Sequence, residues 1–174
     1  YAEANRRVDA VVKGLIHAGI RPGQRVAVVM TGRPSYLSVV TALSRLGAVA
    51  VLVSPQLTEP VLRRALDLGE AEAVITDPDD VVGVRAAFAG KLLVLGAAHQ
   101  SRTLPAQVID LEQIDPEAVA LPSWYRPDPG RARDLAMVFV VGGRFDAPRA
   151  NRITNRRWAF SALGAAATCT LTNR

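Results

Sequence analysis

The feature that most constrains the fold is a series of short, unbroken apolar runs, separated by stretches with helical spacing. The first run, RVAVVMT at residues 25–31, is rich in valine and shows no alternation of polar and apolar residues. Such a run is typical of a strand that is covered on both faces, as in a parallel sheet. Further runs at 48–53, 72–76 and 91–95 predict three more strands.

The stretches between these runs carry the spacing and the end signals of helices. Pro34 suits the first turn of a helix that ends at Gly47, and Thr58 is a candidate cap for the next helix. A first helix before Gly19 and a short helix near 81–88 complete the series. Strands that alternate with helices imply right-handed crossovers. The predicted fold class is therefore α/β, a doubly wound, mostly parallel sheet with helices on both faces.

The pattern loosens over residues 97–133, which contain five prolines and one short predicted strand at 107–110. We therefore expect three parts: an α/β parallel-sheet subdomain at 1–115, a proline-rich connecting loop at 116–133, and a final segment at 134–174. The final segment contains a strand, a glycine-bearing loop and the start of a following helix. With 174 residues and 49% hydrophobic side chains, the chain can bury one core.

Composition excludes several classes of function. A single cysteine, Cys169, allows no internal disulfide, and it is expected to be a buried structural thiol. His17 is expected to be a surface or packing residue and His99 to be solvent-exposed. Asp77, Asp79 and Asp80 are expected to serve in helix capping and turns. No apolar run approaches the roughly 20 residues of a membrane span, and the first residues lack the apolar core of a signal peptide. The predicted location is cytoplasmic.

The formal net charge is +5, and its density is uneven. Arginines are concentrated in the last third of the chain, where a local positive field would suit a polyphosphate or another anion. A solvent-exposed charged surface is the alternative explanation for this concentration of arginines. They are Arg126, Arg131, Arg133, Arg144, Arg149, Arg152, Arg156 and Arg157. No recognisable nucleic-acid reader motif accompanies them, so no nucleic-acid partner is expected. The glycine patterns of α/β hydrolases and of dinucleotide-binding proteins are absent.

Residues 134–155, DLAMVFVVGGRFDAPRANRITN, join an apolar strand to a glycine pair, a Pro-Arg step and an Ile-Thr-Asn helix start. This layout resembles the phosphate loop of the AMP-dependent synthetases and ligases, including the acyl-CoA synthetases, which reads roughly DLAxxxxTSGTTGxPKxxxxTH or TN. The matching positions are Asp134, Leu135, Ala136, Gly143, Pro148, Thr154 and Asn155, with Arg149 where lysine is usual. Three earlier blocks, at 1–30, 33–55 and 57–77, resemble the opening third of an acyl-CoA synthetase in the same order.

The resemblance implies a two-step ligase. A carboxylate, such as a fatty acid, attacks ATP to give an acyl-adenylate, and coenzyme A then takes the acyl group; magnesium would accompany the nucleotide. The resemblance implies no catalytic residue and no metal ligand in this stretch. It places nucleotide binding at six residues: Gly142, Gly143, Arg144, Pro148, Arg149 and Thr154. The glycines would allow close backbone approach and the arginines would supply charge.

The same comparison predicts that the loop is degenerate. Val141, Gly142, Arg144 and Phe145 stand where the family has hydroxyl side chains, and Asp146 replaces a glycine. Each lost hydrogen bond to a charged group is worth roughly 1.5–3 kcal/mol, so two such losses weaken ATP binding by about a thousandfold. A carboxylate near polyphosphate adds repulsion on the order of 4 kcal/mol at about 4 Å and an effective dielectric near 20. We expect weak ATP binding and no adenylation by this stretch alone.

Two hypotheses therefore remain open. In the first, the chain is the N-terminal part of a working acyl-CoA synthetase in which Arg149 replaces the lysine. In the second, it is a degenerate domain of a multidomain lipid-metabolism protein and acts as a scaffold or interaction module. The chain starts at Tyr1 inside the first family block and lacks the later family motifs, so we expect it to be a piece of a longer polypeptide whose remainder is its partner.

Overall fold

The computed structural model describes residues 1–96, 104–105, 107–142 and 147–169. Helices and strands alternate along most of this length, with two short 3-10 helices, η1 and η2. The helices are α1 (Ala2–His17), α2 (Pro34–Leu46), α3 (Glu59–Leu68), η1 (Pro78–Asp80), α4 (Val81–Ala87), η2 (Leu111–Gln113) and α5 (Asn155–Thr168). The strands are β1 (Arg25–Val29), β2 (Val49–Leu52), β3 (Ala73–Thr76), β4 (Lys91–Val94), β5 (Val108–Asp110), β6 (Leu135–Val141) and β7 (Arg149–Thr154).

The strands form one seven-stranded sheet in the order β5-β4-β3-β1-β2-β6-β7. Every neighbouring pair is parallel except β6 and β7, which form an antiparallel pair. The predicted doubly wound, mostly parallel α/β fold is confirmed, and the four central strands lie where the apolar runs predicted them. β7 was not predicted, because its sequence RANRIT is polar and half of its residues are exposed at the sheet edge.

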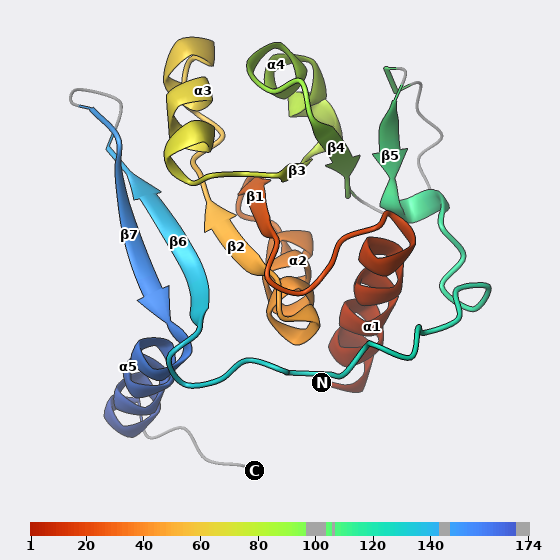
Figure 1. Ribbon diagram of the computed structural model, residues 1–174, viewed down its shortest axis with the longest axis vertical. Helices are drawn as coiled ribbons and strands as arrows, with labels where there is room; N and C mark the ends of the chain where they lie inside the picture. The colour runs from red at the N-terminus through yellow and green to blue at the C-terminus, as the bar shows by residue number, and fades with distance from the viewer. Residues whose placement is uncertain (97–103, 106, 143–146, 170–174) are drawn as a thin grey trace.

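Helices cover both faces of the sheet, and each face has its own core (Figure 1). On one face α1 and α2 pack against alternate strand residues through side chains such as Leu15 and Leu43, which are fully buried. On the other face α3 and α4 bury Leu66 and Val84. The central strands are therefore covered on both faces, as the absence of polar alternation in their sequences indicated.

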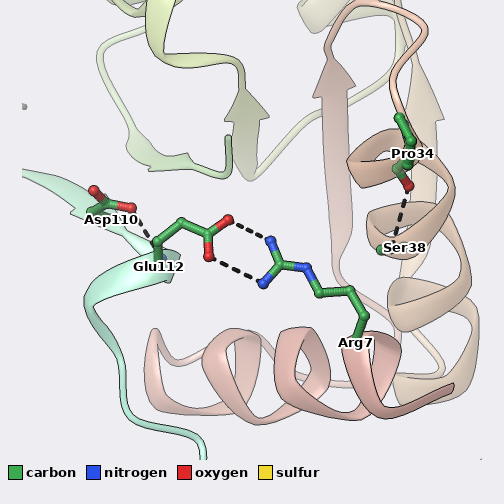
Figure 2. Close-up of polar contacts among 5 residues, drawn as sticks. All are labelled: Arg7, Pro34, Ser38, Asp110 and Glu112. Carbon is green, nitrogen blue, oxygen red and sulfur yellow. Dashed lines mark hydrogen bonds and ion pairs between the residues drawn. The ribbon is translucent and has the colours of Figure 1, made fainter. Parts of the chain in front are cut away.

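The connection from η2 to β6 follows the outside of α1 and then passes the N-terminal end of that helix (Figure 1). It begins at an ion pair, in which both outer nitrogens of the Arg7 guanidinium donate to the carboxylate of Glu112 (Figure 2). The Glu112 side chain is almost fully buried, whereas that of Arg7 is one-third exposed. Asp110 accepts a hydrogen bond from the Glu112 backbone N–H at 3.0 Å, which caps η2.

Helix α5 begins where the sequence predicted a helix start, but it has no buried residue among those described. Trp158, Phe160 and Leu163 are 49%, 69% and 67% exposed. Cys169 follows this helix and is also exposed, so the expectation of a buried thiol is wrong. None of the helices in the described part of the chain has the length and apolar character required to span a membrane.

Candidate functional site

The predicted phosphate loop joins β6 to β7, at the end of β6 that lies beside the carboxyl ends of the central strands. β6 is parallel to β2, and Leu52 of β2 stands opposite Phe139 of β6. In open α/β sheets, ligands bind in the crevice outside the carboxyl ends of the strands. The start of β7 returns to the same edge, because Val141 and Arg149 are paired across the hairpin.

Three of the six predicted nucleotide-binding residues can be placed at this loop end. Gly142 has φ +83°, a left-handed conformation that favours glycine, and it is exposed. Pro148 is half-buried, whereas Arg149 is exposed and forms no ion pair or side-chain hydrogen bond with any described residue. Gly143 and Arg144 lie outside the described residues, as do Phe145 and Asp146. The placed part of the loop end therefore offers one unpaired cation and one glycine, and no side-chain hydroxyl.

Thr154 lies at the opposite end of the hairpin. It pairs with Leu135 at the start of β6, five residues along β7 from Arg149, which corresponds to roughly 16 Å at the usual strand rise. Its hydroxyl accepts a hydrogen bond from the Arg157 backbone N–H at 3.3 Å and so caps α5. The structure therefore brings Gly142, Pro148 and Arg149 together but does not bring Thr154 to them.

The predicted arginine cluster is divided in the same way. Arg131 lies in the turn before β6, and Arg156 lies in the first turn of α5, where its backbone N–H donates to the Ala132 carbonyl of that turn at 2.8 Å. Arg152 is neutralised by Glu70, with a separation of 2.9 Å between Nη2 and Oε1. A hydrogen bond from Arg25, followed by the charges of Arg25 and Arg152, lowers the pKa of the Glu70 carboxyl despite some desolvation. Among the placed arginines, Arg149 alone stands free beside the loop end of the hairpin.

The acidic residues that follow β3 do not cap a helix with their side chains, so the predicted capping role is wrong. The predicted turn is confirmed, because the Asp80 backbone N–H donates to the Asp77 carbonyl at 3.2 Å. Asp77 is fully buried, and its Oδ2 accepts hydrogen bonds from both the backbone N–H and the hydroxyl of Thr31 at 2.7 Å. Burial raises the pKa of Asp80, helped by the charges of Asp77 and Asp79. No group of His, Cys, Asp or Glu side chains in the described ranges is arranged to hold a metal ion.

Sequence reasoning missed the Thr31–Asp77 link, although a signal was present. Thr31 lies two residues after β1 and Asp77 directly follows β3, and the carboxyl ends of neighbouring parallel strands meet at one edge of the sheet. His17 is exposed at the end of α1, and His99 lies outside the described residues.

A small cavity of about 260 Å³ opens at the same carboxyl edge. It lies between the ends of β1 and β2, the first turn of α2, and β6, and its walls include Met30, Tyr36, Leu52, Pro55 and Phe139. Burial raises the pKa of the Tyr36 hydroxyl, which therefore stays protonated at neutral pH. In the described part of the chain, the carboxyl edge thus combines an apolar recess with one free cation, Arg149.

Comparison with known proteins identifies the class. The model of the AMP-binding enzyme family matches residues 1–143, so the chain belongs to that family. A feruloyl-CoA synthase from Amycolatopsis sp is 39% identical over 99 residues, which is 57% of this chain and 20% of that protein. A 2-succinylbenzoate–CoA ligase from Bacillus cereus is 37% identical over 79 residues, 45% of this chain and 16% of the ligase. The matches thus span a fifth or less of the length of these curated relatives.

Solved structures show the same fold. Apo MatB from Rhodopseudomonas palustris superimposes with a TM-score of 0.75 at 21% identity, covering 99% of this chain and 32% of MatB. The o-succinylbenzoate coenzyme A synthetase of Bacillus subtilis in complex with AMP gives a TM-score of 0.71 at 18% identity, covering 98% of this chain and 40% of the synthetase. The chain therefore resembles the N-terminal part of AMP-binding coenzyme A ligases.

Proposed function

We propose that this chain is the N-terminal part of a carboxylate–coenzyme A ligase of the AMP-binding family whose phosphate loop no longer supports adenylation. The observation that carries the proposal is the donor set at the loop end of β6 and β7. The placed residues there, 141–142 and 147–149, supply Arg149 and no side-chain hydroxyl. A polyphosphate requires several donors aimed at its oxygens, and a single guanidinium provides two at most in fork geometry.

The donors supplied by residues 141–142 and 147–149 alone do not fit a tightly held triphosphate. The Thr154 hydroxyl is engaged in capping α5 at the far end of β7, so it does not make up for the missing hydroxyls at the loop. The loss of two hydrogen bonds to charged phosphate oxygens corresponds to about a thousandfold weaker binding. Among the described residues, no group of His, Cys, Asp or Glu side chains is arranged to hold a magnesium ion beside the loop.

The substrate class we propose is a small carboxylic acid, with coenzyme A as the acceptor and ATP as the activating nucleotide in a competent relative. The two curated relatives are named for feruloyl-CoA and 2-succinylbenzoate, which are aromatic acyl groups. Their names support a carboxylate substrate, while the fatty acid implied by the sequence resemblance stays a prediction. A cytoplasmic location likewise stays a prediction.

Calorimetry with ATP tests the loop. We expect no saturable binding to this chain below about 1 mM, and little change in Arg149→Ala. Restoring the family residues at 141–146 as Thr-Ser-Gly-Thr-Thr-Gly, together with Arg149→Lys, should strengthen binding by at least about tenfold. The Arg64→Ala variant, which removes an exposed arginine of α3, is the matched control. A micromolar dissociation constant for the unaltered chain would overturn the proposal.

The alternative, a working ligase in which Arg149 replaces the lysine, is favoured by one observation: Arg149 is exposed and has no partner among the described residues. Carboxylate-dependent ATP–pyrophosphate exchange by the full-length protein decides between the two. Exchange that is lost in Arg149→Ala and retained in Arg64→Ala would establish the alternative. If the unaltered protein shows no exchange and restoring the family loop residues produces it, the loop is degenerate. A scaffold or interaction role would then be left for the domain.

A further inference from the structure

We propose that the cavity between α1 and the connection that follows η2 binds a small amphipathic carboxylate, an apolar body carrying one negative charge. The cavity lies on the outer side of α1, away from the β6–β7 loop end, and the inference does not rest on the proposed function. Its volume is about 590 Å³. Small-molecule sites typically have volumes of roughly 300–1,000 Å³.

Two segments far apart in the sequence form the walls. Helix α1 contributes Arg6, Ala10 and Lys13 on one side. The connection contributes Pro116, Leu121 and Tyr125 on the other. Most of this surface is apolar, and Leu121 is half exposed, so an apolar ligand body would cover side-chain surface that water now contacts.

The wall formed by the connection is held at both ends, so the cavity exists before a ligand arrives. At its start, the buried Glu112 carboxylate is paired with Arg7 of α1 (Figure 2). At its end, the Trp124 ring lies 4.7 Å from the Arg21 guanidinium carbon. A preformed wall lowers the entropic cost of binding, because little of the site has to be ordered by the ligand.

The charges around the cavity leave one cation without a partner. Asp9 accepts a hydrogen bond from Arg45 at 2.6 Å, so its charge is compensated from α2. Lys13 stands 3.6 Å from Glu117, which is an exposed ion pair of small net effect. Arg6 forms no ion pair or side-chain hydrogen bond with a described residue. One uncompensated guanidinium matches a carboxylate better than a doubly charged phosphate.

Tyr125 supplies a neutral donor to the wall of the same cavity. Burial raises the pKa of its hydroxyl, with smaller and opposed effects from Arg45, Asp9 and Asp128, so the hydroxyl is protonated at neutral pH. An apolar wall with one free cation and one neutral hydroxyl suits an aryl or short alkyl acid. The ligand would place its carboxylate toward Arg6 and its apolar body against Leu121 and Pro116.

The test uses 3-phenylpropionate as the probe and amide chemical shifts of the isotope-labelled chain as the readout. We expect saturable shifts over residues 6–13 and 116–125, with a dissociation constant on the order of 1 mM, the range for a ligand of about this size. The neutral analogue 3-phenyl-1-propanol should bind at least about tenfold more weakly, since it lacks the charge that pairs with Arg6.

Two variants sharpen the result. Arg6→Gln should weaken 3-phenylpropionate binding by about tenfold or more, and Ala10→Trp should abolish binding by filling the cavity from the helix side. Arg64→Gln, on the opposite face of the sheet, should bind like the parent chain, and each variant must keep a native-like amide spectrum. The proposal is overturned if no shifts occur at about 10 mM probe, if the alcohol binds as well as the acid, or if Arg6→Gln binds unchanged.

Discussion

One carboxylate oxygen of Asp77 accepts two hydrogen bonds from Thr31, from its backbone N–H and from its hydroxyl, each at 2.7 Å. The other oxygen, Oδ1, is buried without a partner among the described residues. Thr31 follows β1 and Asp77 follows β3, and these strands are parallel neighbours in the sheet. The contact therefore joins the carboxyl ends of two strands whose following helices, α2 and α4, cover opposite faces.

We predict that Thr31→Val lowers the free energy of unfolding by about 1–2 kcal/mol, because a buried carboxylate loses one of its two donors. Urea unfolding followed by circular dichroism measures the change. Thr58→Val is the matched control, since the Thr58 side chain makes no capping hydrogen bond to α3 and should change stability by less than about 0.5 kcal/mol. Equal effects in the two variants would contradict the assigned role of the Thr31 hydroxyl.

The Arg7–Glu112 ion pair gives a second prediction. Arg7→Met leaves the buried Glu112 carboxylate without its cation and should lower the free energy of unfolding by about 2–3 kcal/mol, less than for a fully buried pair because Arg7 is one-third exposed. The double variant Arg7→Met/Glu112→Leu should regain most of this loss, since no unpaired charge remains. Urea unfolding of the two single variants and the double variant forms the test, and strictly additive losses would refute the coupling.

The central strands could be predicted from sequence because they are covered on both faces, so a continuous apolar run such as that of β1 has one simple interpretation. β7 could not, because an edge strand exposed to water carries arginine and asparagine as readily as valine. This miss had a consequence at the candidate site. With β7 unrecognised, the sequence placed Thr154 near Arg149, whereas the two residues lie at opposite ends of the extended strand β7.

Contacts that depend on the order of strands in the sheet were also missed, because the sequence indicates which residues follow strands but not which strands are neighbours. Thr31 and Asp77 are 46 positions apart, and their contact requires that β3 lie beside β1 rather than beside β2. Asp77 was therefore predicted to serve in capping and turns, which is the local role of an aspartate before a helix. Cys169 was predicted to be buried from residue preference alone, but α5 leaves it exposed.

A pH-dependent prediction follows from Asp80. Burial and the charges of Asp77 and Asp79 raise its pKa in the folded state, with Arg33 opposing them. The contribution of Asp80 to stability is therefore fully present below the unfolded-state pKa of about 3.9 and is lost as the pH rises through the folded-state value. Asp80→Asn should raise the melting temperature at pH 7 relative to the parent chain, and this gain should vanish near about pH 3.

Thermal unfolding between pH 3 and pH 8 measures this difference. Asp67→Asn, which neutralises an exposed carboxylate on α3, reports the effect of the charge change alone. A destabilising effect of Asp80→Asn at pH 7, or a gain that persists unchanged at pH 3, would show that the partly buried Asp80 charge is not the cause.

Substituting alanine should change stability in opposite directions at two glycines, Gly69 at the end of α3 and Gly83 within α4. Neither has a positive φ that would by itself require glycine. At Gly69 an added Cβ would lie 2.3 Å from Cγ1 of the fully buried Val51, so Gly69→Ala should lower the free energy of unfolding by about 1–3 kcal/mol. At Gly83 in α4 an added Cβ would meet nothing within 4 Å, and Gly83→Ala should raise the free energy of unfolding by about 0.5–1 kcal/mol.

Urea unfolding of a double variant tests the contact at Gly69. Combining Gly69→Ala with Val51→Ala removes the clashing methyl, so the double variant should lose less stability than the sum of the two single losses. Full additivity would show that the close approach of α3 to β2 is not what requires glycine at position 69.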